Sequence, residues 1–219
     1  MPVDSNEKIY DFRFNSSQDQ KREEIWKILI ETFFQKLIPS SSILVDLGCG
    51  RGEFLGQISA QRRIGIDREN LLRQHYRNRI EFFVSVNSNW TFLENESVDT
   101  VFASNVFEHF ESKKELDGTL AEIRRVLRKG AQLIVLTPNI RLEPKRYWDY
   151  YDHHIPLTDR SVEEALVKAG FTLKRTIVRF LPWSTDSRVP FSKMLLRVYL
   201  RLPFLWRIVG KQSLVIGIK

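Results

Sequence analysis

The chain has 219 residues, of which 42% are hydrophobic and 28% charged, a composition that excludes fibrous, collagen-like and low-complexity classes. Such a length buries roughly 70% of the surface of the unfolded chain, so we expect one domain that folds without a disulfide or a metal. Residues 190–219 carry six basic and no acidic side chains and so hold most of the net charge of +7, which argues against a nucleic-acid partner. The single cysteine and the lack of a basic and apolar leader predict a cytoplasmic location.

Helix and strand signals alternate along the chain. Residues 20–38 place apolar side chains at helical spacing before Pro39, which predicts a helix that leads into the core. Residues 43–47 form a short apolar run before a glycine cluster, as a buried parallel strand does before a tight turn. The further predicted strands are 63–66, 81–86, 100–104, 132–137, 172–180 and 213–218, and the further predicted helices are 53–60, 69–77, 113–128, 159–169 and 191–202.

This alternation is typical of right-handed βαβ units. We therefore expect an α/β fold with a doubly wound, mostly parallel seven-stranded sheet, a helical lead-in over residues 1–42 and the main domain over residues 43–219. A basic amphipathic insertion at residues 190–210 precedes the last strand. Ligands bind such sheets at the carboxyl ends of the strands, so the expected site loops follow Leu47, Ile66, Val86, Ser104 and Thr137.

Three glycines, Gly48, Gly50 and Gly52, stand at alternate positions directly after the first predicted strand. Glycine allows positive φ angles and a close approach of a ligand to the backbone. A dinucleotide fingerprint would need glycine where Glu53 stands, and it usually has an apolar residue where this chain has Asp46. A carboxylate at that position suits a ligand with an ammonium group better than it suits a pyrophosphate.

The sequence Asp-Leu-Gly-Cys-Gly-Arg-Gly at 46–52 resembles motif I of the class I S-adenosylmethionine-dependent methyltransferases, and the resemblance continues over residues 43–171. It implies S-adenosylmethionine as cofactor and a Rossmann-like methyltransferase fold. Asp67 ends the second strand, where the family has an acidic residue that accepts both ribose hydroxyls. Asn87 stands where relatives often have an Asp that faces the adenine amino group. The cofactor-binding residues implied by the resemblance are Asp46, Gly48, Cys49, Gly50, Gly52, Asp67, Arg68, Asn87, Ser88 and Ser104.

Residues 97–109 resemble the family's fourth strand and the loop beneath the reactive methyl group, which implicates Ser104 and Asn105 there. These residue types also have plainer interpretations, in which Asp46 caps a turn and Asp67 is a solvated strand end. Cys49 is expected to be a small packing residue, because methyl transfer requires no covalent enzyme intermediate.

Several short motifs resemble methyltransferases of bacterial surface-polysaccharide assembly, of the O-antigen type. They are Phe-Arg-Phe at 12–14, Lys-Arg-Glu-Glu at 21–24, Gly-Cys-Gly-Arg-Gly-Glu-Phe-Leu at 48–55, Thr-Pro-Asn at 137–139 and Tyr-Tyr-Asp-His-His-Ile-Pro at 150–156. This resemblance implies O-methylation of a sugar or glycan, including a lipid-linked one. A sugar hydroxyl benefits from a positioned base, and histidine titrates near neutral pH. We favour His153, which matches the motif, over His109 as that base, with Asn105 as the third catalytic candidate and no metal site.

The acceptor has alternatives. A carboxylate or phosphate would need no base, and basic residues should line its pocket instead. Candidates for that lining are Arg141, Lys145 and Arg146, although these residues could equally form a solvated run of charges. The same loop contains an aromatic cluster that could stack on a ring of the acceptor or simply cap the core. Its members are Tyr147, Trp148, Tyr150 and Tyr151. Other open functions are a quinone or phenol O- or C-methyltransferase, a tRNA or rRNA methyltransferase, and a non-enzymatic module that binds the cofactor. The oligomeric state is not predicted.

The predicted helix at 191–202 carries Lys193, Arg197 and Arg201 on one face, and apolar side chains occupy much of the rest. Charges interrupt the apolar run too often for a transmembrane span. Two interpretations remain open. The apolar face packs on the sheet, or the helix and the residues up to 207 rest on the anionic inner surface of the membrane, beside a lipid-linked acceptor.

Overall fold

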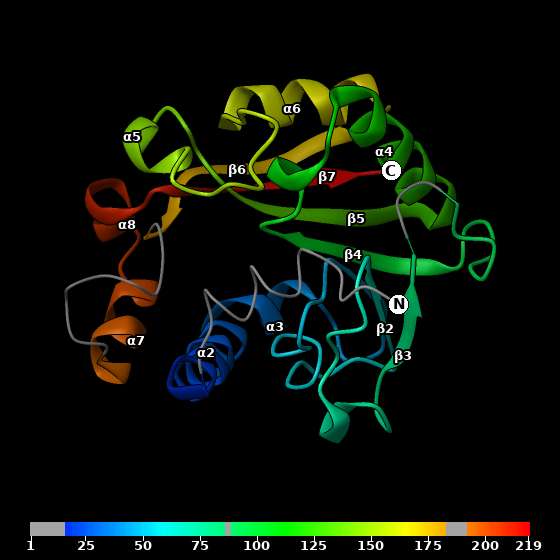
Figure 1. Cartoon of the computed structure of the whole chain (residues 1–219), viewed down its shortest axis with the longest axis horizontal. Helices are drawn as coiled ribbons and strands as arrows, with labels where there is room; N and C mark the ends of the chain where they lie inside the picture. Colours follow the sequence, from blue (N-terminus) through cyan, green and yellow to red (C-terminus); the bar gives the residue numbers. More distant parts are fainter. Residues whose placement is uncertain (1–15, 86–88, 183–191) are drawn as a thin grey trace.

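The computed structural model describes residues 16–85, 89–182 and 192–219 (Figure 1). Within these ranges the strands form one seven-stranded sheet in the order β3-β2-β1-β4-β5-β7-β6. Their bounds are β1 Ile43–Leu47, β2 Arg62–Asp67, β3 Glu81–Val84, β4 Val98–Ser104, β5 Leu127–Pro138, β6 Thr172–Leu181 and β7 Gln212–Ile218. The strands from β3 to β5 pair in parallel, and β7 is antiparallel to both β5 and β6. The expected doubly wound, mostly parallel sheet is confirmed.

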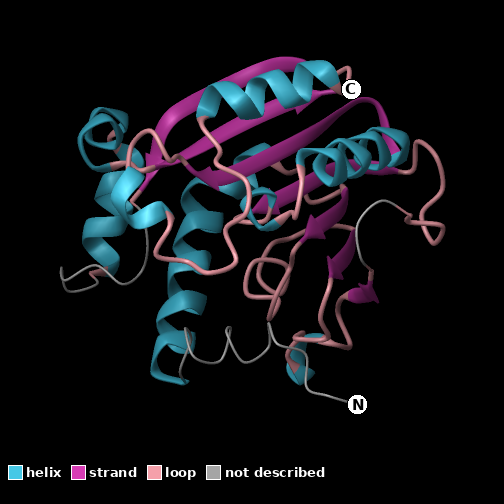
Figure 2. Ribbon diagram, turned by 45° about the horizontal axis from the view of Figure 1, so that its top comes forward, coloured by secondary structure: helices cyan, strands magenta, loops and turns pink. Residues whose placement is uncertain are grey.

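Helices cover both faces of the sheet (Figure 2). One face is covered by α4 (Lys113–Val126) and α6 (Asp159–Lys168). The other is covered by a helical run of α2 (Ser16–Leu29), the π-helical turn η1 (Ile30–Phe34) and α3 (Gln35–Leu37), together with α7 (Lys193–Arg201) and α8 (Pro203–Val209). Three short helices in loops are η2 (Gln74–Tyr76), η3 (Phe107–His109) and α5 (Pro144–Tyr147). The predicted lead-in helix is confirmed, and the division of the chain at residue 42 stays a prediction.

A hydrophobic core lies on each face, because the central strands bury side chains on both sides. On the lead-in side the core is rich in aromatic rings. The ring centroids of Phe54 and Phe102 are 4.1 Å apart, and those of Phe34 and Phe102 are 5.1 Å apart. These contacts join the lead-in helix, the loop after β1 and the central strand β4, so the N-terminal helix is part of the same core as the sheet.

Two predicted helices are wrong. Residues 53–60 form turns, and a side chain at Gly56 would lie 2.3 Å from the ring of Tyr76. Glycine weakens a helix, and here it lets the backbone pack directly on that ring. Residues 69–77 contain only η2, because hydrogen bonds from Glu69 N to Asp67 Oδ1 (3.1 Å) and from Arg73 N to Arg51 O (3.3 Å) draw the backbone toward the loop after β1.

The helix α7 lies beside α2. Lys193 pairs with Glu24, and Arg197 Nη2 lies 3.6 Å from Glu31 Oε2. The hydroxyl of Tyr199 donates to the backbone of β6. Part of the predicted helix therefore packs on the core, and two of its three basic side chains pair with acidic residues. Across the described ranges, no helix is both long and apolar enough to cross a bilayer.

Candidate active site

The glycine loop leaves β1 and passes close to the strands on either side. All three glycines have positive φ, at +70° for Gly48, +52° for Gly50 and +85° for Gly52. The N–H of Gly48 donates to the backbone oxygen of Ile66 (2.8 Å). A Cβ on Gly48 would lie only 2.2 Å from Val106 Cγ2. The loop therefore needs glycine both for its backbone angles and for its approach to the segment after β4.

Two carboxylates face this loop from the ends of β1 and β2. Asp46 is buried, and its pKa is raised by that burial and then by the nearby charges of Asp67 and Glu53. Burial also raises the pKa of Asp67, although its Oδ2 accepts a hydrogen bond from the N–H of Gly50 (2.8 Å). A ligand that brings an ammonium group and hydroxyl donors would compensate this negative charge. The donor set and the glycine cradle thus fit S-adenosylmethionine.

Cys49 and Arg68, two further predicted cofactor residues, have structural contacts. The sulfur of Cys49 lies 2.8 Å from the position that a Cβ on Gly65 would take, so the thiol fills the space above β2. Burial raises the pKa of this thiol, which makes it a poor nucleophile. Arg68 forms an ion pair with Glu115 of α4. The predicted residues Asn87 and Ser88, and the motif at 12–14, lie outside the described residues.

Asn105 turns the chain at the end of β4. Its φ is +53°, a left-handed conformation that asparagine tolerates better than most residues. Its N–H donates to Leu136 O (2.8 Å), and its side-chain amide lies 3.3 Å from Ser104 Oγ. Ser104 is the last residue of β4, and the exposed Asn105 follows it. Both predicted residues therefore lie at the carboxyl edge of the sheet, where the resemblance places the reactive methyl group.

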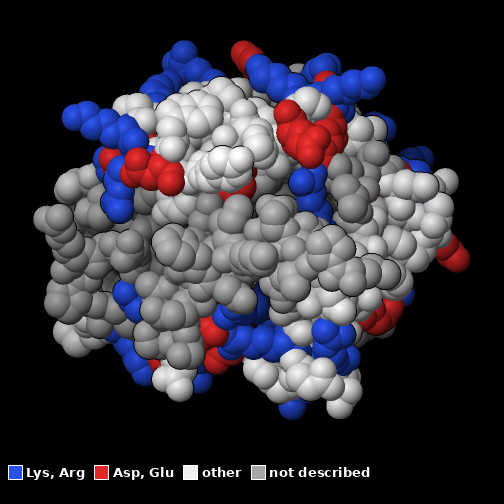
Figure 3. All heavy atoms as spheres, in the orientation of Figure 1, with Lys and Arg blue, Asp and Glu red and all other residues white. Residues whose placement is uncertain are grey.

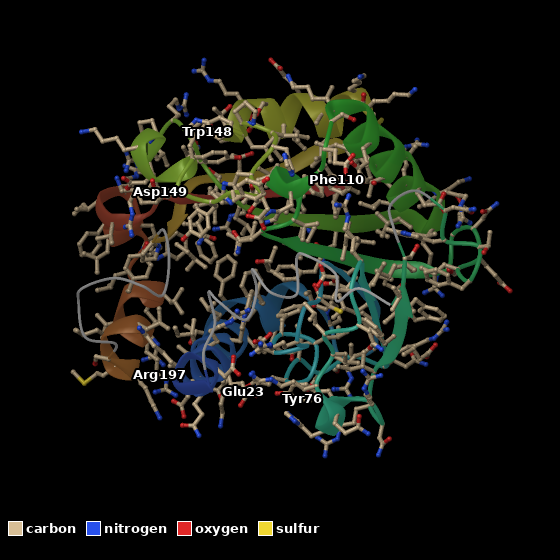
Figure 4. All side chains as sticks on the ribbon, in the orientation of Figure 1. Glu23, Tyr76, Phe110, Trp148, Asp149 and Arg197 are labelled. Atoms are coloured by element: carbon tan, nitrogen blue, oxygen red, sulfur yellow. The ribbon has the colours of Figure 1, made fainter. Side chains whose placement is uncertain are left out.

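A network of charges joins α2 to the glycine loop. Arg51 in the loop donates to Asp19 (2.8 Å), and Arg73 reaches both Asp19 (2.9 Å) and Glu23. The Tyr76 hydroxyl donates to Glu23 (3.3 Å), and Figure 4 labels both residues in the same part of the molecule. Sequence patterns did not reveal this network, because its partners come from separate segments.

A second group of titratable side chains lies just after β4. Glu108 is fully buried, and its Oε2 accepts a hydrogen bond from Thr137 Oγ1 at the end of β5 (3.1 Å). Its Oε1 lies 3.9 Å from His109 Nε2, and burial raises the pKa of the carboxyl group. The loop after α5 brings His153 to the same place, with its ring centroid 5.0 Å from that of His109. Both predicted histidines therefore meet, together with Glu108, which was not predicted.

Asp152, also not predicted, orients His109. The Nδ1 atom of His109 lies 2.9 Å from the backbone oxygen of Asp152 and 3.2 Å from its Oδ2. Both oxygens are acceptors, so Nδ1 carries a proton and Nε2 is left to bind a proton or a ligand. Burial alone would lower the pKa of His109, but Asp152 and Glu108 together raise it.

Some predicted acceptor residues instead hold the loop together. Arg141 Nη2 lies 2.6 Å from Asp159 Oδ1. Tyr147 is buried, and its hydroxyl donates to Ile155 O (2.5 Å). In Figure 4, Trp148 and Asp149 lie on the same side of the sheet as Phe110, which follows η3. Among the predicted acceptor residues, those with exposed side chains are Arg141, Lys145, Arg146, Trp148 and Tyr151.

Known proteins show the same fold and related sequences. A family model described as a methyltransferase domain matches residues 19–176. The mouse tRNA (carboxymethyluridine(34)-5-O)-methyltransferase ALKBH8 is 31% identical over 52% of this chain, and the Saccharomyces cerevisiae enzyme of that name is 28% identical over 53%. The chain covers only 17% and 42% of these two relatives. The crystal structure of an S-adenosylmethionine-dependent methyltransferase from Archaeoglobus fulgidus superposes with a TM-score of 0.67 at 17% identity, covering 96% of this chain and 98% of that one.

We expect Gly48→Ala to weaken binding of S-adenosylhomocysteine by about tenfold or more, because the loop must move away from Val106. Gly130→Ala is the matched control, since Gly130 also has positive φ (+78°) but has no atom within 4 Å of an added Cβ. Isothermal titration calorimetry measures both. Equal, wild-type affinities of the two variants would show that this loop does not hold the cofactor.

The matched family model extends from α2 into β6. The sheet order and the glycine loop agree with it. The chain therefore belongs to the methyltransferase domain family.

Proposed function

We propose that this chain is an S-adenosylmethionine-dependent methyltransferase and that it methylates an oxygen atom of its acceptor beside Glu108, His109 and His153. The observation that supports this is the gathering of three titratable side chains at the carboxyl end of β4, the edge where doubly wound sheets bind ligands. When bound, S-adenosylmethionine supplies an electrophilic methyl group. Because methylation of a hydroxyl releases one proton, the chain's own side chains have to manage that proton.

For the cofactor, we propose roles that follow the charges of the site. Asp46 and the glycine loop would hold the end of the ligand that carries the ammonium group, and Asp67 would accept the ribose hydroxyls. Ser104 and Asn105 would lie beside the methyl group. Cys49 would support the loop through its packing on β2, and Arg68 would support it through its ion pair with α4.

We assign the proton-accepting role to His109. Its side chain is 31% exposed, so an acceptor can reach it, and Asp152 stabilises its protonated form. His153, the residue that the motif favours, is 8% exposed, and its ring stacks on Tyr150 with centroids 4.9 Å apart. We therefore propose that His153 positions His109 and the acceptor.

A glycan is the acceptor that we favour. The motif at 150–156 resembles polysaccharide methyltransferases. Tyr151 of the motif is 88% exposed, and Trp148, just before it, is 54% exposed. Exposed aromatic rings of this kind suit stacking on a sugar ring.

A tRNA acceptor is the second candidate, because the two relatives named above are tRNA methyltransferases. Electrostatics gives this candidate little support. On the face that Figure 3 shows, basic side chains along the upper edge, over α4, α5 and α6, are intermixed with acidic ones. A tRNA backbone would favour a continuous row of basic side chains, and no such row extends over that edge.

The proposal predicts transfer of labelled methyl groups to lipid-linked sugars in a panel that also contains quinols and tRNA. His109→Ala should lower turnover about a hundredfold while the affinity for S-adenosylhomocysteine stays unchanged, because the base acts on the acceptor and not on the cofactor.

His154→Ala is the matched control, since His154 is exposed and adjacent in sequence to the cluster. Label found only in tRNA would contradict the glycan assignment. Full turnover of His109→Ala, measured where chemistry limits the rate, would contradict the role of His109.

We also propose that the enzyme acts in the cytoplasm at the inner face of the membrane, through α7 and α8. The exposed large apolar side chains of these helices are Met194, Leu195, Val198, Leu202, Phe204, Ile208 and Val209, and we call them the C-terminal apolar surface. Arg201 and Arg207 are exposed beside it. Apolar side chains flanked by arginine suit the boundary between acyl chains and anionic headgroups, where a lipid-linked acceptor would be presented.

Sedimentation with vesicles that contain phosphatidylserine should therefore retain the protein, and Phe204→Ser with Ile208→Ser should release it. Val84→Ser with Val167→Ser is the matched control, because both residues are 57% exposed elsewhere on the molecule. Changing Arg201 and Arg207 to Gln should weaken binding about tenfold or more. Equal retention of both serine double variants would contradict membrane contact through this surface.

A further inference from the structure

We propose that Glu108, His109 and His153 form a binding site for a divalent transition-metal ion such as Zn²⁺. The inference rests on the proposed function, because the ion would lie at the acceptor side of the active site. One carboxylate and two imidazoles are the donor set of catalytic zinc and non-haem iron sites, which leave coordination positions open for substrate or water.

Glu108 supplies the negative charge. A buried carboxylate needs hydrogen bonds or an opposite charge, and Thr137 satisfies only its Oε2. The other oxygen, Oε1, has no hydrogen-bond partner among the described residues. Its distance to His109 Nε2, 3.9 Å, is too long for a hydrogen bond. A cation bound to both atoms would provide the missing partner.

His109 is already oriented as a metal ligand. Histidines that bind metals usually donate the N–H of the other ring nitrogen to a carboxylate or a carbonyl group, which fixes the ring and its tautomer. Asp152 offers both, with its backbone oxygen 2.9 Å and its Oδ2 3.2 Å from Nδ1 of His109. The nitrogen that faces Glu108 is therefore the one with a lone pair to offer.

His153 supplies the third ligand from a distant part of the chain. One ligand atom of each of the three residues lies within 4.8 Å of the other two. Ligands of one zinc ion are about 3.3 Å apart at bond lengths of about 2.0–2.2 Å, so the side chains must approach each other by roughly 1.5 Å or less. The backbone N–H groups of His154 and Ile155 donate to Glu108 O at 2.8 and 3.1 Å. These bonds hold the two segments together and keep the three side chains near one another.

A metal ion here would change how the acceptor loses its proton. Coordination of the acceptor hydroxyl at an open position would lower its pKa, and the proton would leave to water. With the ion bound, His109 would promote loss of the proton through the ion, and without the ion it would accept the proton itself. Expansion of such a site to five ligands would also favour an acceptor with neighbouring hydroxyl groups, such as a sugar diol, because both oxygens could then bind one ion.

Calorimetric titration of the chelator-treated full chain with Zn²⁺ tests the site, and Co²⁺ provides a second readout through its visible absorption. We expect one Zn²⁺ per chain and a Co²⁺ spectrum of a site with nitrogen ligands. Glu108→Gln keeps an acceptor for Thr137 but removes the charge. It should weaken Zn²⁺ binding more than about a hundredfold, because loss of an outer partner alone costs about ten- to a hundredfold.

His154→Ala is the matched control, because this exposed histidine follows His153 directly and would reveal adventitious surface binding. Binding of S-adenosylhomocysteine shows that each variant is folded. Should Glu108→Gln fail to fold, His109→Gln replaces it, since the His109 side chain is 31% exposed and a change there disturbs the core less.

Stoichiometric Zn²⁺ binding that survives His154→Ala and is lost on changing Glu108 or His109 supports the site. Absence of saturable binding, or equal loss in His154→Ala, overturns it. The two proposals fail separately. If His109→Ala abolishes methyl transfer and the wild type binds no Zn²⁺, only the metal site is wrong. If Zn²⁺ binds at these residues but methyl transfer goes to a nitrogen or carbon atom, only the proposed O-methylation is wrong.

Discussion

The close contact between the glycine loop and the two strands beside β1 is the constraint on which the rest of the site depends. On one side, the N–H groups of Gly48 and Gly50 donate to Ile66 O and Asp67 Oδ2, both at 2.8 Å, so the loop is fastened to the end of β2. On the other side, Gly48 leaves no room for a side chain next to Val106. The segment after β4 is thereby placed against the loop. Since η3 follows at once, the position of the acceptor side depends on the packing of the cofactor side.

Glu108 connects the acceptor side to the rest of the fold. Its backbone oxygen accepts hydrogen bonds from His154 and Ile155, and its side chain accepts one from Thr137 of β5. One residue thus joins β4, β5 and the loop after α5. The same contacts bury its carboxylate beside His109 and leave one oxygen for a ligand. Glu108 therefore both supports the fold and offers an oxygen atom to a ligand, so a substitution at this residue affects stability and binding together.

Local patterns in the sequence predict most of this fold, because central strands such as β1 and β4 contain short apolar runs and helices such as α4 and α6 bury one apolar face. The glycine loop and Asp67 were predictable for the same reason, since they directly follow predicted strands. The helices expected at 53–60 and 69–77 fail where contacts distant in sequence override local preference, as when Gly56 packs on the ring of Tyr76. The cluster around Glu108 could be predicted only in part. His109 and His153 were recognisable as loop histidines, but the pairing of His109 with Asp152 depends on how the loop after α5 folds back onto η3.

The central claim is that the ends of β1 and β2 hold the cofactor, and Asp67→Ala tests it most directly. Calorimetry with S-adenosylhomocysteine should show an affinity about tenfold or more below that of the wild type, because a hydrogen bond to a charged group contributes roughly 1.5 to 3 kcal/mol. Asp117→Ala is the reference, since Asp117 pairs with Lys168 between α4 and α6. An unchanged affinity of Asp67→Ala, alongside a folded protein, would contradict the account.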